Sequence, residues 1–126
     1  MAEKKDIIEK DFEFLKGKIL ALLLFGSRAT KKGHERSDFD LCIVKPYQQE
    51  IIKEVFRKVD VAGKKYDVYL FEELPLYMKM EVINNHEIIF SENIYDLYEY
   101  FYFYKKLWKD QERRNKISRE DILKML

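Results

Sequence analysis

The chain carries Gly26-Ser27, then ten residues, then Asp38-Phe39-Asp40, and this motif is the most informative part of the sequence. Apolar runs at residues 19–25 and 41–44 lie on either side and read as two strands joined by a loop. Side chains alternate along a strand, so Asp38 and Asp40 share one face while Phe39 points the other way, toward a core. The sequence therefore predicts two carboxylates on one face where the second strand begins.

The paired acids and the Gly-Ser turn before them indicate a phosphate-handling site. Two neighbouring carboxylates repel each other unless a positive charge lies between them, and a divalent cation with oxygen ligands meets that need. Gly26 lets the backbone approach a ligand closely, and Ser27 offers a hydroxyl and an N–H to a phosphate. Each feature alone also fits an ordinary turn or a polar cap. Together, at this spacing, they favour metal-assisted nucleotidyl transfer.

A third acid, Asp67, lies near the start of another strand-like run, residues 65–71. Acids are rare inside apolar strands because burying an unpaired charge is costly. Neighbouring strands lie about 4.8 Å apart, so if this strand pairs with residues 39–45, Asp67 joins Asp38 and Asp40 around one site. Three carboxylates can hold up to two metal ions, and Asp67 would be the natural base for an attacking hydroxyl. The alternative is an acid at a strand edge beside a turn.

The composition excludes several classes of protein. Lys and Arg number 24 against 23 Asp and Glu, so a net charge of +1 argues against direct binding to nucleic acid. The single cysteine, Cys42, lies in an apolar strand and cannot form a disulfide within the chain, which favours a reducing cytoplasm. Residues 1–16 lack the apolar core of a signal peptide. The apolar run at 19–25 is far shorter than the roughly 20 residues of a membrane span.

The hydrophobic periodicity predicts a small mixed sheet flanked by helices, an α/β or α+β fold in one domain over residues 1–126. We expect strands at residues 18–25, 39–45, 65–71 and 86–90, the second stopped by Pro46. We expect helices at residues 3–16, 47–59, 73–84 and 93–113, the first ended by Gly17, with residues 28–37 as a polar loop. Ser118 begins a Ser-x-x-Asp capping box, which predicts a short separate helix at the end of the chain.

The predicted helix at 93–113 is rich in aromatic residues on more than one side. Positions 94, 97, 98, 101, 105 and 108 form one apolar stripe that we expect to face the core. Tyr100, Phe103 and Tyr104 lie off that stripe, which favours a surface for a protein partner.

Arg28, in the predicted loop at 28–37, directly follows Ser27 and is the strongest candidate to neutralise a triphosphate. The two histidines, His34 in the same loop and His86 at the predicted fourth strand, are interpreted as surface residues.

With these residues identified, the chain resembles the nucleotidyltransferase superfamily related to DNA polymerase beta. The motif spacing, the run Gly-Ser-Arg-Ala-Thr at 26–30 and the small size resemble its minimal nucleotidyltransferase (MNT) branch, with a catalytic core at about residues 5–90 and a C-terminal segment at 91–126. The resemblance implies the nucleotidyltransferase fold, a Mg²⁺ cofactor, and ATP as substrate. It also implies that Gly26, Ser27 and Arg28 bind the nucleotide, that Asp38, Asp40 and Asp67 form the catalytic metal site, and that Asp67 activates the acceptor.

Many MNT proteins are antitoxins of type VII HEPN/MNT toxin–antitoxin systems. The resemblance therefore implies a cytoplasmic hetero-oligomer with a cognate HEPN ribonuclease toxin, in which AMP passes from ATP to a tyrosine of the toxin. Two alternatives remain open. One is nucleotidyl transfer to a small molecule, although relatives of that kind carry an extra helical domain and only about 36 residues follow residue 90 here. The other is a non-catalytic antitoxin that masks its partner by contact.

Overall fold

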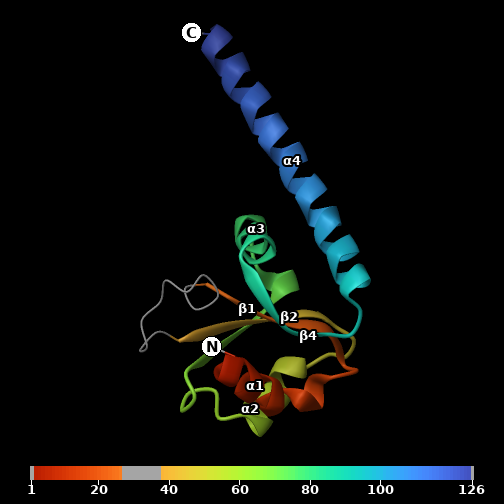
Figure 1. Ribbon diagram of the computed structural model, residues 1–126. Coiled ribbons are helices and arrows are strands. Elements are labelled where there is room, and N and C mark those ends of the chain that lie inside the picture. The colour runs from red at the N-terminus through yellow and green to blue at the C-terminus, as the bar shows by residue number, and fades with distance from the viewer. Residues whose placement is uncertain (1, 27–37, 126) are drawn as a thin grey trace.

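The computed structural model describes residues 2–26 and 38–125, and Figure 1 shows how their helices and strands are arranged. One sheet contains β1 (Ile19–Phe25), β2 (Phe39–Pro46), β3 (Tyr66–Leu70) and β4 (His86–Ser91). The helices are α1 (Ala2–Asp11), α2 (Ile51–Lys58), α3 (Leu76–Asn84) and α4 (Ile94–Met125), with 3-10 turns η1 (Glu13–Leu15) and η2 (Phe71–Glu73). No helix within these ranges is long and apolar enough to cross a membrane.

The strands lie in the order β3-β2-β1-β4. β1 is antiparallel to both β2 and β4, whereas β2 is parallel to β3, and α2 forms the crossover between them. A parallel pair needs such a crossover, whereas antiparallel strands can be joined directly. The mixed sheet flanked by helices confirms the predicted α+β fold class. The arrangement brings the start of β2, the start of β3 and the end of β1 to the same end of the sheet, measured along the strands.

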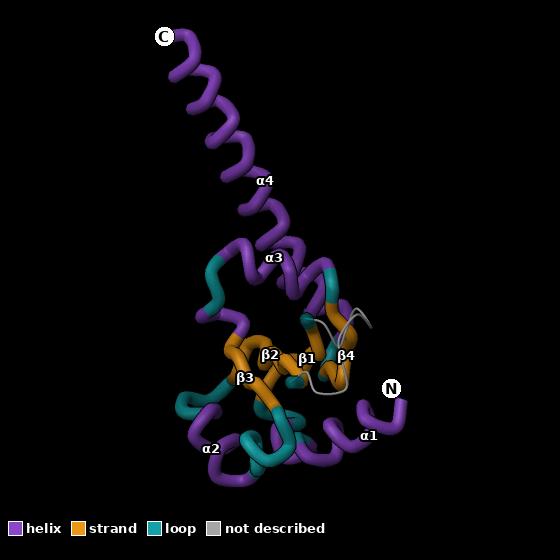
Figure 2. Tube along the Cα trace, turned by 90° about the vertical axis from the view of Figure 1, so that its left-hand side faces the viewer, coloured by secondary structure: helices purple, strands orange, loops and turns teal. Residues whose placement is uncertain are grey.

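Helices cover both faces of the sheet, which explains why all seven residues of β1 are buried. In Figures 1 and 2, α1 and α2 lie on one side, and α3 and the first turns of α4 lie on the other. Alternation along the strands divides the apolar side chains between two cores. The α1/α2 side contains Phe12, Leu22, Leu24, Phe39, Leu41, Ile43 and Val55, and the α3/α4 side contains Leu23, Phe25, Cys42, Val44, Phe71, Leu97 and Phe101.

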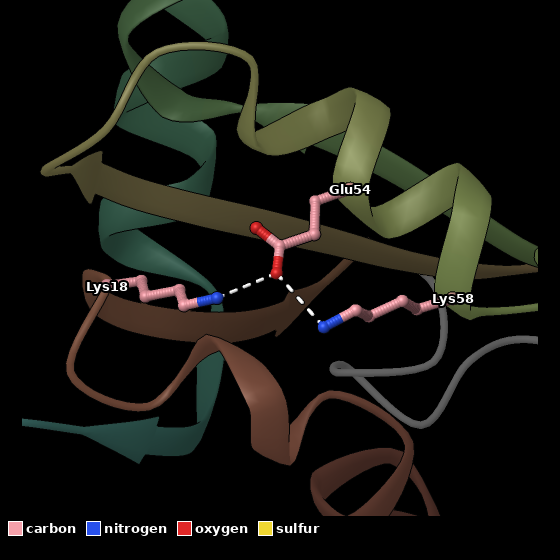
Figure 3. A network of polar contacts seen from close by, with 3 residues as sticks. All are labelled: Lys18, Glu54 and Lys58. Atoms are coloured by element: carbon pink, nitrogen blue, oxygen red, sulfur yellow. Dashed lines mark hydrogen bonds and ion pairs between the residues drawn. The ribbon is translucent and has the colours of Figure 1, made fainter.

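A polar contact on the first side fastens α2 to the strand layer (Figure 3). Glu54 of α2 accepts from Lys18, just before β1, with Nζ 2.7 Å from Oε1, and pairs with Lys58 one helical turn later at 3.2 Å. The hydrogen bond from Lys18 is the main reason that the pKa of Glu54 lies below its ordinary value, with Lys58 contributing in the same direction. The carboxylate of Glu54 is therefore held in its ionised form by two cations.

Several predicted element ends differ from the structure for local reasons. α1 stops at Asp11 and the chain continues through η1 before Gly17, where φ is +85°. α2 begins at Ile51 rather than 47, because Glu50 adopts a left-handed backbone conformation with φ of +63°. α3 begins at Leu76 rather than 73, directly after Pro75, because residues 71–73 form η2. β2 continues through Pro46, so the prediction that this proline stops the strand at residue 45 is wrong.

The predicted separate helix at Ser118 is wrong, because α4 runs unbroken from Ile94 to Met125, 32 residues. The sequence contains no glycine or proline after Pro75, so nothing in the chain forces a break. A capping box satisfies the free N–H groups of a helix start, and within a continuous helix those groups already have partners. The Ser-x-x-Asp pattern was therefore a false signal here.

The side of α4 that faces the core also differs from the prediction. Leu97 and Phe101 are buried as expected, but Tyr98 of the same predicted stripe is 52% exposed. Tyr100 and Tyr104, expected on a partner surface, instead pack around Phe71, with ring centroids 5.8 and 5.3 Å from it. The core stripe is therefore rotated toward these two tyrosines, while Phe103 is 60% exposed, as the partner-surface prediction required.

Candidate active site

Asp40 of β2 and Asp67 of β3 lie directly opposite each other in the parallel pair. The backbone N–H of Phe39 donates to the carbonyl of Lys65 at 2.8 Å, which fixes the register of the two strand starts. Asp38 comes one residue before β2 and is exposed. The predicted pairing of these strands is confirmed. It brings Asp40 and Asp67, which are 27 positions apart in the sequence, side by side at one end of the sheet.

The start of β3 is held in place from the opposite face of the sheet. Tyr66 is buried there, and its hydroxyl donates to Oδ2 of Asp11 in α1 at 2.6 Å. Lys64 pairs with the other oxygen of Asp11 at 2.8 Å. Because side chains alternate, fixing Tyr66 on the α1 side directs Asp67 to the α3/α4 side, where Asp40 also points. α1 therefore positions the third carboxylate without touching it.

The acids raise one another's pKa, as expected for neighbouring carboxylates. Burial raises the pKa of Asp40, and the charges of Asp67 and Asp38 raise it further. The pKa of Asp67 is also raised, by partial burial, by the charge of Asp38 and by a hydrogen bond with that residue. All three acids therefore lie close enough to interact electrostatically. Such a cluster favours a proton or a metal ion between its members.

Gly26 is needed where β1 ends against Asp40. Its φ of +76° lies in the left-handed region, and Phe25 immediately before it pairs with Asp40 across the antiparallel strands. A Cβ built on Gly26 would collide with the carboxylate of Asp40. Glycine is therefore required both by the backbone conformation and by the close approach. The pairing of β1 with β2 therefore places Gly26, from the first half of the motif, against Asp40 from the second half.

Other predicted candidates are placed elsewhere or are not described. Ser27, Arg28 and His34 lie outside the described residues. The His86 ring nitrogen Nδ1 lies 2.9 and 3.0 Å from the carbonyl oxygens of Val82 and Ile83 at the end of α3. The ring also contacts Phe101 at 5.4 Å between centroids, so His86 has a structural role rather than being a plain surface residue.

Tyr69 is a neighbour of the acids that sequence reasoning missed. It follows Asp67 by two positions, so both side chains lie on the same face of β3, and its ring meets Phe25 edge-on at 5.6 Å. Burial raises the pKa of its hydroxyl, and the charges of Asp40, Asp67 and Asp38 add to that shift. The two-residue period of the strand was the signal that would have identified it.

The donor set fits a magnesium–nucleotide complex. Carboxylate oxygens are the hard ligands that Mg²⁺ prefers, and this ion is usually bound by one or two carboxylates together with substrate phosphates and waters. Among the described residues, no three Asp, Glu, His or Cys side chains are already arranged to hold an ion alone. The acids therefore fit a site that phosphate oxygens complete, rather than a closed protein cage.

Comparisons with known proteins agree with this geometry. The family described as polymerase beta, nucleotidyltransferase matches residues 5–95. The chain is 43% identical over 97 residues to a protein of Methanocaldococcus jannaschii named "Putative protein adenylyltransferase", covering 77% of this chain and 75% of that protein.

Solved structures share the fold at lower identity. A chain from a toxin–antitoxin crystal structure with AMP-PNP matches with a TM-score of 0.70 at 17% identity, covering 94% of this chain and 98% of that one. A chain from tri-AMPylated Shewanella oneidensis HEPN toxin in complex with MNT antitoxin matches with a TM-score of 0.66 at 12% identity, covering 94% and 95%. The chain belongs to the nucleotidyltransferase family related to polymerase beta and is a nucleotidyltransferase.

Proposed function

We propose that this protein is a Mg²⁺-dependent protein adenylyltransferase that transfers AMP from ATP to a tyrosine of a cognate HEPN ribonuclease toxin, and so serves as the antitoxin of a type VII system. The observation that carries the proposal is the alignment of Asp40 with Asp67 across β2 and β3, beside Gly26. The names of the M. jannaschii relative and of the toxin–antitoxin structures support the choice of acceptor.

Each residue of the cluster has a role in this proposal. Asp38, Asp40 and Asp67 would hold Mg²⁺, which when bound neutralises charge on the triphosphate and on the departing pyrophosphate. Gly26 leaves room for a phosphate beside Asp40, and Ser27 and Arg28 would bind the remaining phosphate oxygens. Tyr69, on the same face as Asp67, would form one wall of the nucleotide site.

The transfer itself is one displacement at phosphorus. The tyrosine oxygen of the acceptor bonds to the α-phosphorus of ATP, and the bond from that phosphorus to the bridging oxygen of pyrophosphate breaks. Asp67 accepts the phenolic proton, because its carboxylate is exposed at the start of the edge strand β3, where an acceptor can reach it. The products are an AMP-tyrosine phosphodiester and pyrophosphate.

The shape of the molecule favours an acceptor carried by another protein. After β4 the chain forms α4, whose C-terminal part extends away from the sheet in both Figure 1 and Figure 2. Asp67 is exposed at the start of β3, so a side chain of another protein can reach it. A non-catalytic antitoxin is the less favoured alternative, because it would not need three mutually repelling carboxylates.

The decisive experiment measures AMP transfer directly. The protein is incubated with ATP labelled at the α-phosphate, Mg²⁺ and a purified candidate HEPN toxin, and the modified residue is identified by mass spectrometry. We expect label on a toxin tyrosine, lost with EDTA and with Asp40→Asn. The matched control is Asp6→Asn, an exposed acid on α1 at the opposite face of the sheet. Label that appears only on small molecules, or toxin inhibition that survives Asp40→Asn, would overturn the proposal.

A further inference from the structure

β3 is an edge strand, and its outer side carries backbone groups that can pair with another chain. The N–H of Tyr66, at the start of the strand, donates away from β2 to the carbonyl of Val61 at 2.8 Å. Backbone groups alternate in direction along a strand, so the C=O of Tyr66, both groups of Val68 and the N–H of Leu70 also point outward. Within the part of the chain that the structure describes, no hydrogen bond reaches these four groups.

A shallow groove runs along this edge. Its volume is about 260 Å³, and its walls come from α2, from β3 and from the end of η2 with the residue after it: Ile52, Val68, Tyr69, Leu70, Glu73 and Leu74. Residues 68–70 are only half-buried, whereas residues 41–44 of the neighbouring strand β2 are fully buried. The groove therefore offers apolar side chains beside outward-facing backbone groups.

The open edge begins at the acidic cluster. Asp67 lies between Tyr66 and Val68, and its exposed side chain is on the α3/α4 face of the sheet, opposite Asp40. A strand added to β3 would lie about 4.8 Å away, and its side chains on that face would stand beside Asp67 and Tyr69. A chain that pairs with this edge therefore passes directly by the acids.

We propose that the acceptor protein docks by adding an extended, tyrosine-bearing segment to the open edge of β3, hydrogen-bonded to Tyr66, Val68 and Leu70. This inference rests on the proposed function and specifies how that function's acceptor is recognised. A row of outward N–H and C=O groups is matched by another extended backbone, and a segment that carries the acceptor hydroxyl must in any case come to Asp67. Backbone pairing supplies affinity, and the side chains of the groove supply selectivity.

Amide hydrogen exchange followed by NMR tests the pairing residue by residue. A purified candidate HEPN toxin, added with Mg²⁺ and a non-hydrolysable ATP analogue, should slow exchange of the Val68 and Leu70 amides by about tenfold or more. The amides of Tyr66 and Tyr69 are internal controls, because the first already donates to a carbonyl and the second points toward β2. Unchanged exchange at Val68 and Leu70 in the complex overturns the proposal. So does slow exchange there in the free chain, which would mean that this chain or a second copy already covers the edge.

Val68→Pro tests the same contact by kinetics. Proline removes the outward N–H and leaves the pairing with β2 intact, because residues 67 and 69 form it. We expect KM for the toxin to rise about tenfold or more, with unchanged affinity for the ATP analogue in calorimetry. Val68→Thr keeps the N–H and is the matched control. An unaltered KM in a folded Val68→Pro chain overturns the proposal, and if circular dichroism shows that this variant is unfolded, the exchange experiment on the unmodified chain decides.

Docking and chemistry are measured separately in these experiments. Label on the toxin without protection of the Val68 and Leu70 amides overturns the docking proposal and leaves the proposed function intact. Protection without label supports the docking proposal and contradicts the proposed function. A toxin that neither protects these amides nor takes up label overturns both.

Discussion

The pKa values of carboxylates at two places in this molecule shift in opposite directions. One place is Glu54 on α2, and the other is the cluster of Asp38, Asp40 and Asp67. Glu54, on the α1/α2 side, lies between Lys18 and Lys58, and its pKa is lowered. Among the described residues, the charged neighbours that perturb Asp40, on the other side, are Asp67 and Asp38, and together with burial they raise its pKa. The first arrangement satisfies its charge within the protein. The second gathers carboxylates that raise each other's pKa, and perturbed groups of this kind are characteristic of functional sites.

The largest effect should come from removing one acid of the cluster. Asp40→Asn should reduce AMP transfer by about 10³-fold or more, because the bound cation loses a charged ligand. The same change should leave the metal-free protein equally or more stable, because it removes repulsion with Asp67 and Asp38. Transfer of label and thermal unfolding of the same preparation measure both effects. A variant that retains full activity would remove Asp40 from the metal site.

A second test asks whether Gly26 is required for space or only for its backbone conformation. Gly26→Ala should abolish binding of a non-hydrolysable ATP analogue in calorimetry, because the new methyl group displaces the carboxylate of Asp40. Gly17→Ala is the matched control: its φ of +85° is similarly left-handed, but a Cβ there meets nothing within 4 Å. Both variants should lose about 1–2 kcal/mol of stability from backbone strain. Equal nucleotide affinity in the two variants would mean that the phosphates bind elsewhere.

The pH dependence of stability should differ in sign between the two groups. The folded protein holds the proton of Asp40 more tightly than the unfolded chain does, so ionising Asp40 opposes folding. In the absence of metal, stability should therefore fall as pH rises above the ordinary value of 3.8, relative to Asp40→Asn. Saturating Mg²⁺ with nucleotide should abolish that decline. Urea unfolding across this pH range measures the difference, and parallel curves for the two proteins would contradict the raised pKa.

The smallest effect on stability should come from replacing Glu54, which pairs with Lys18 and Lys58. The ionised carboxylate of Glu54 stabilises the folded protein at pH values above its ordinary pKa of 4.5. This stabilisation is lost as the pH falls through the lower pKa that Glu54 has in the folded protein. Glu54→Gln should therefore destabilise the protein slightly at neutral pH and not at all in acid. High salt should reduce the difference, because the ion pairs are partly exposed. Unfolding curves at low and high salt provide the measurement, with Glu73→Gln, an exposed acid on η2, as control. An effect that grows with salt would show that packing rather than charge is involved.

Local patterns predicted the strands and the chemical class well, and the long helix less well. The four strands were located because apolar runs bounded by turn residues depend mainly on nearby sequence. Element ends moved where one residue adopted an unusual backbone conformation, as Glu50 did before α2. The rotation of α4 was misjudged because a helix that is aromatic on every side carries no clear periodicity. The side of α4 that faces the core is set by packing against Phe71, which is distant in the sequence and contacts the rings of Tyr100 and Tyr104.

The residue pattern alone places Asp38 and Asp40 at the start of a strand, a glycine at the end of the strand before them, and a third acid at the start of a later strand. Those properties follow from the alternation of side chains and from residue identity, which are local. Strand pairing in the folded protein, in contrast, places Asp67 opposite Asp40 and brings Gly26 against the Asp40 carboxylate. Strand register is set by pairing between distant segments and by the helices packed on them, such as α1 through Tyr66 and Asp11, and no local pattern encodes it.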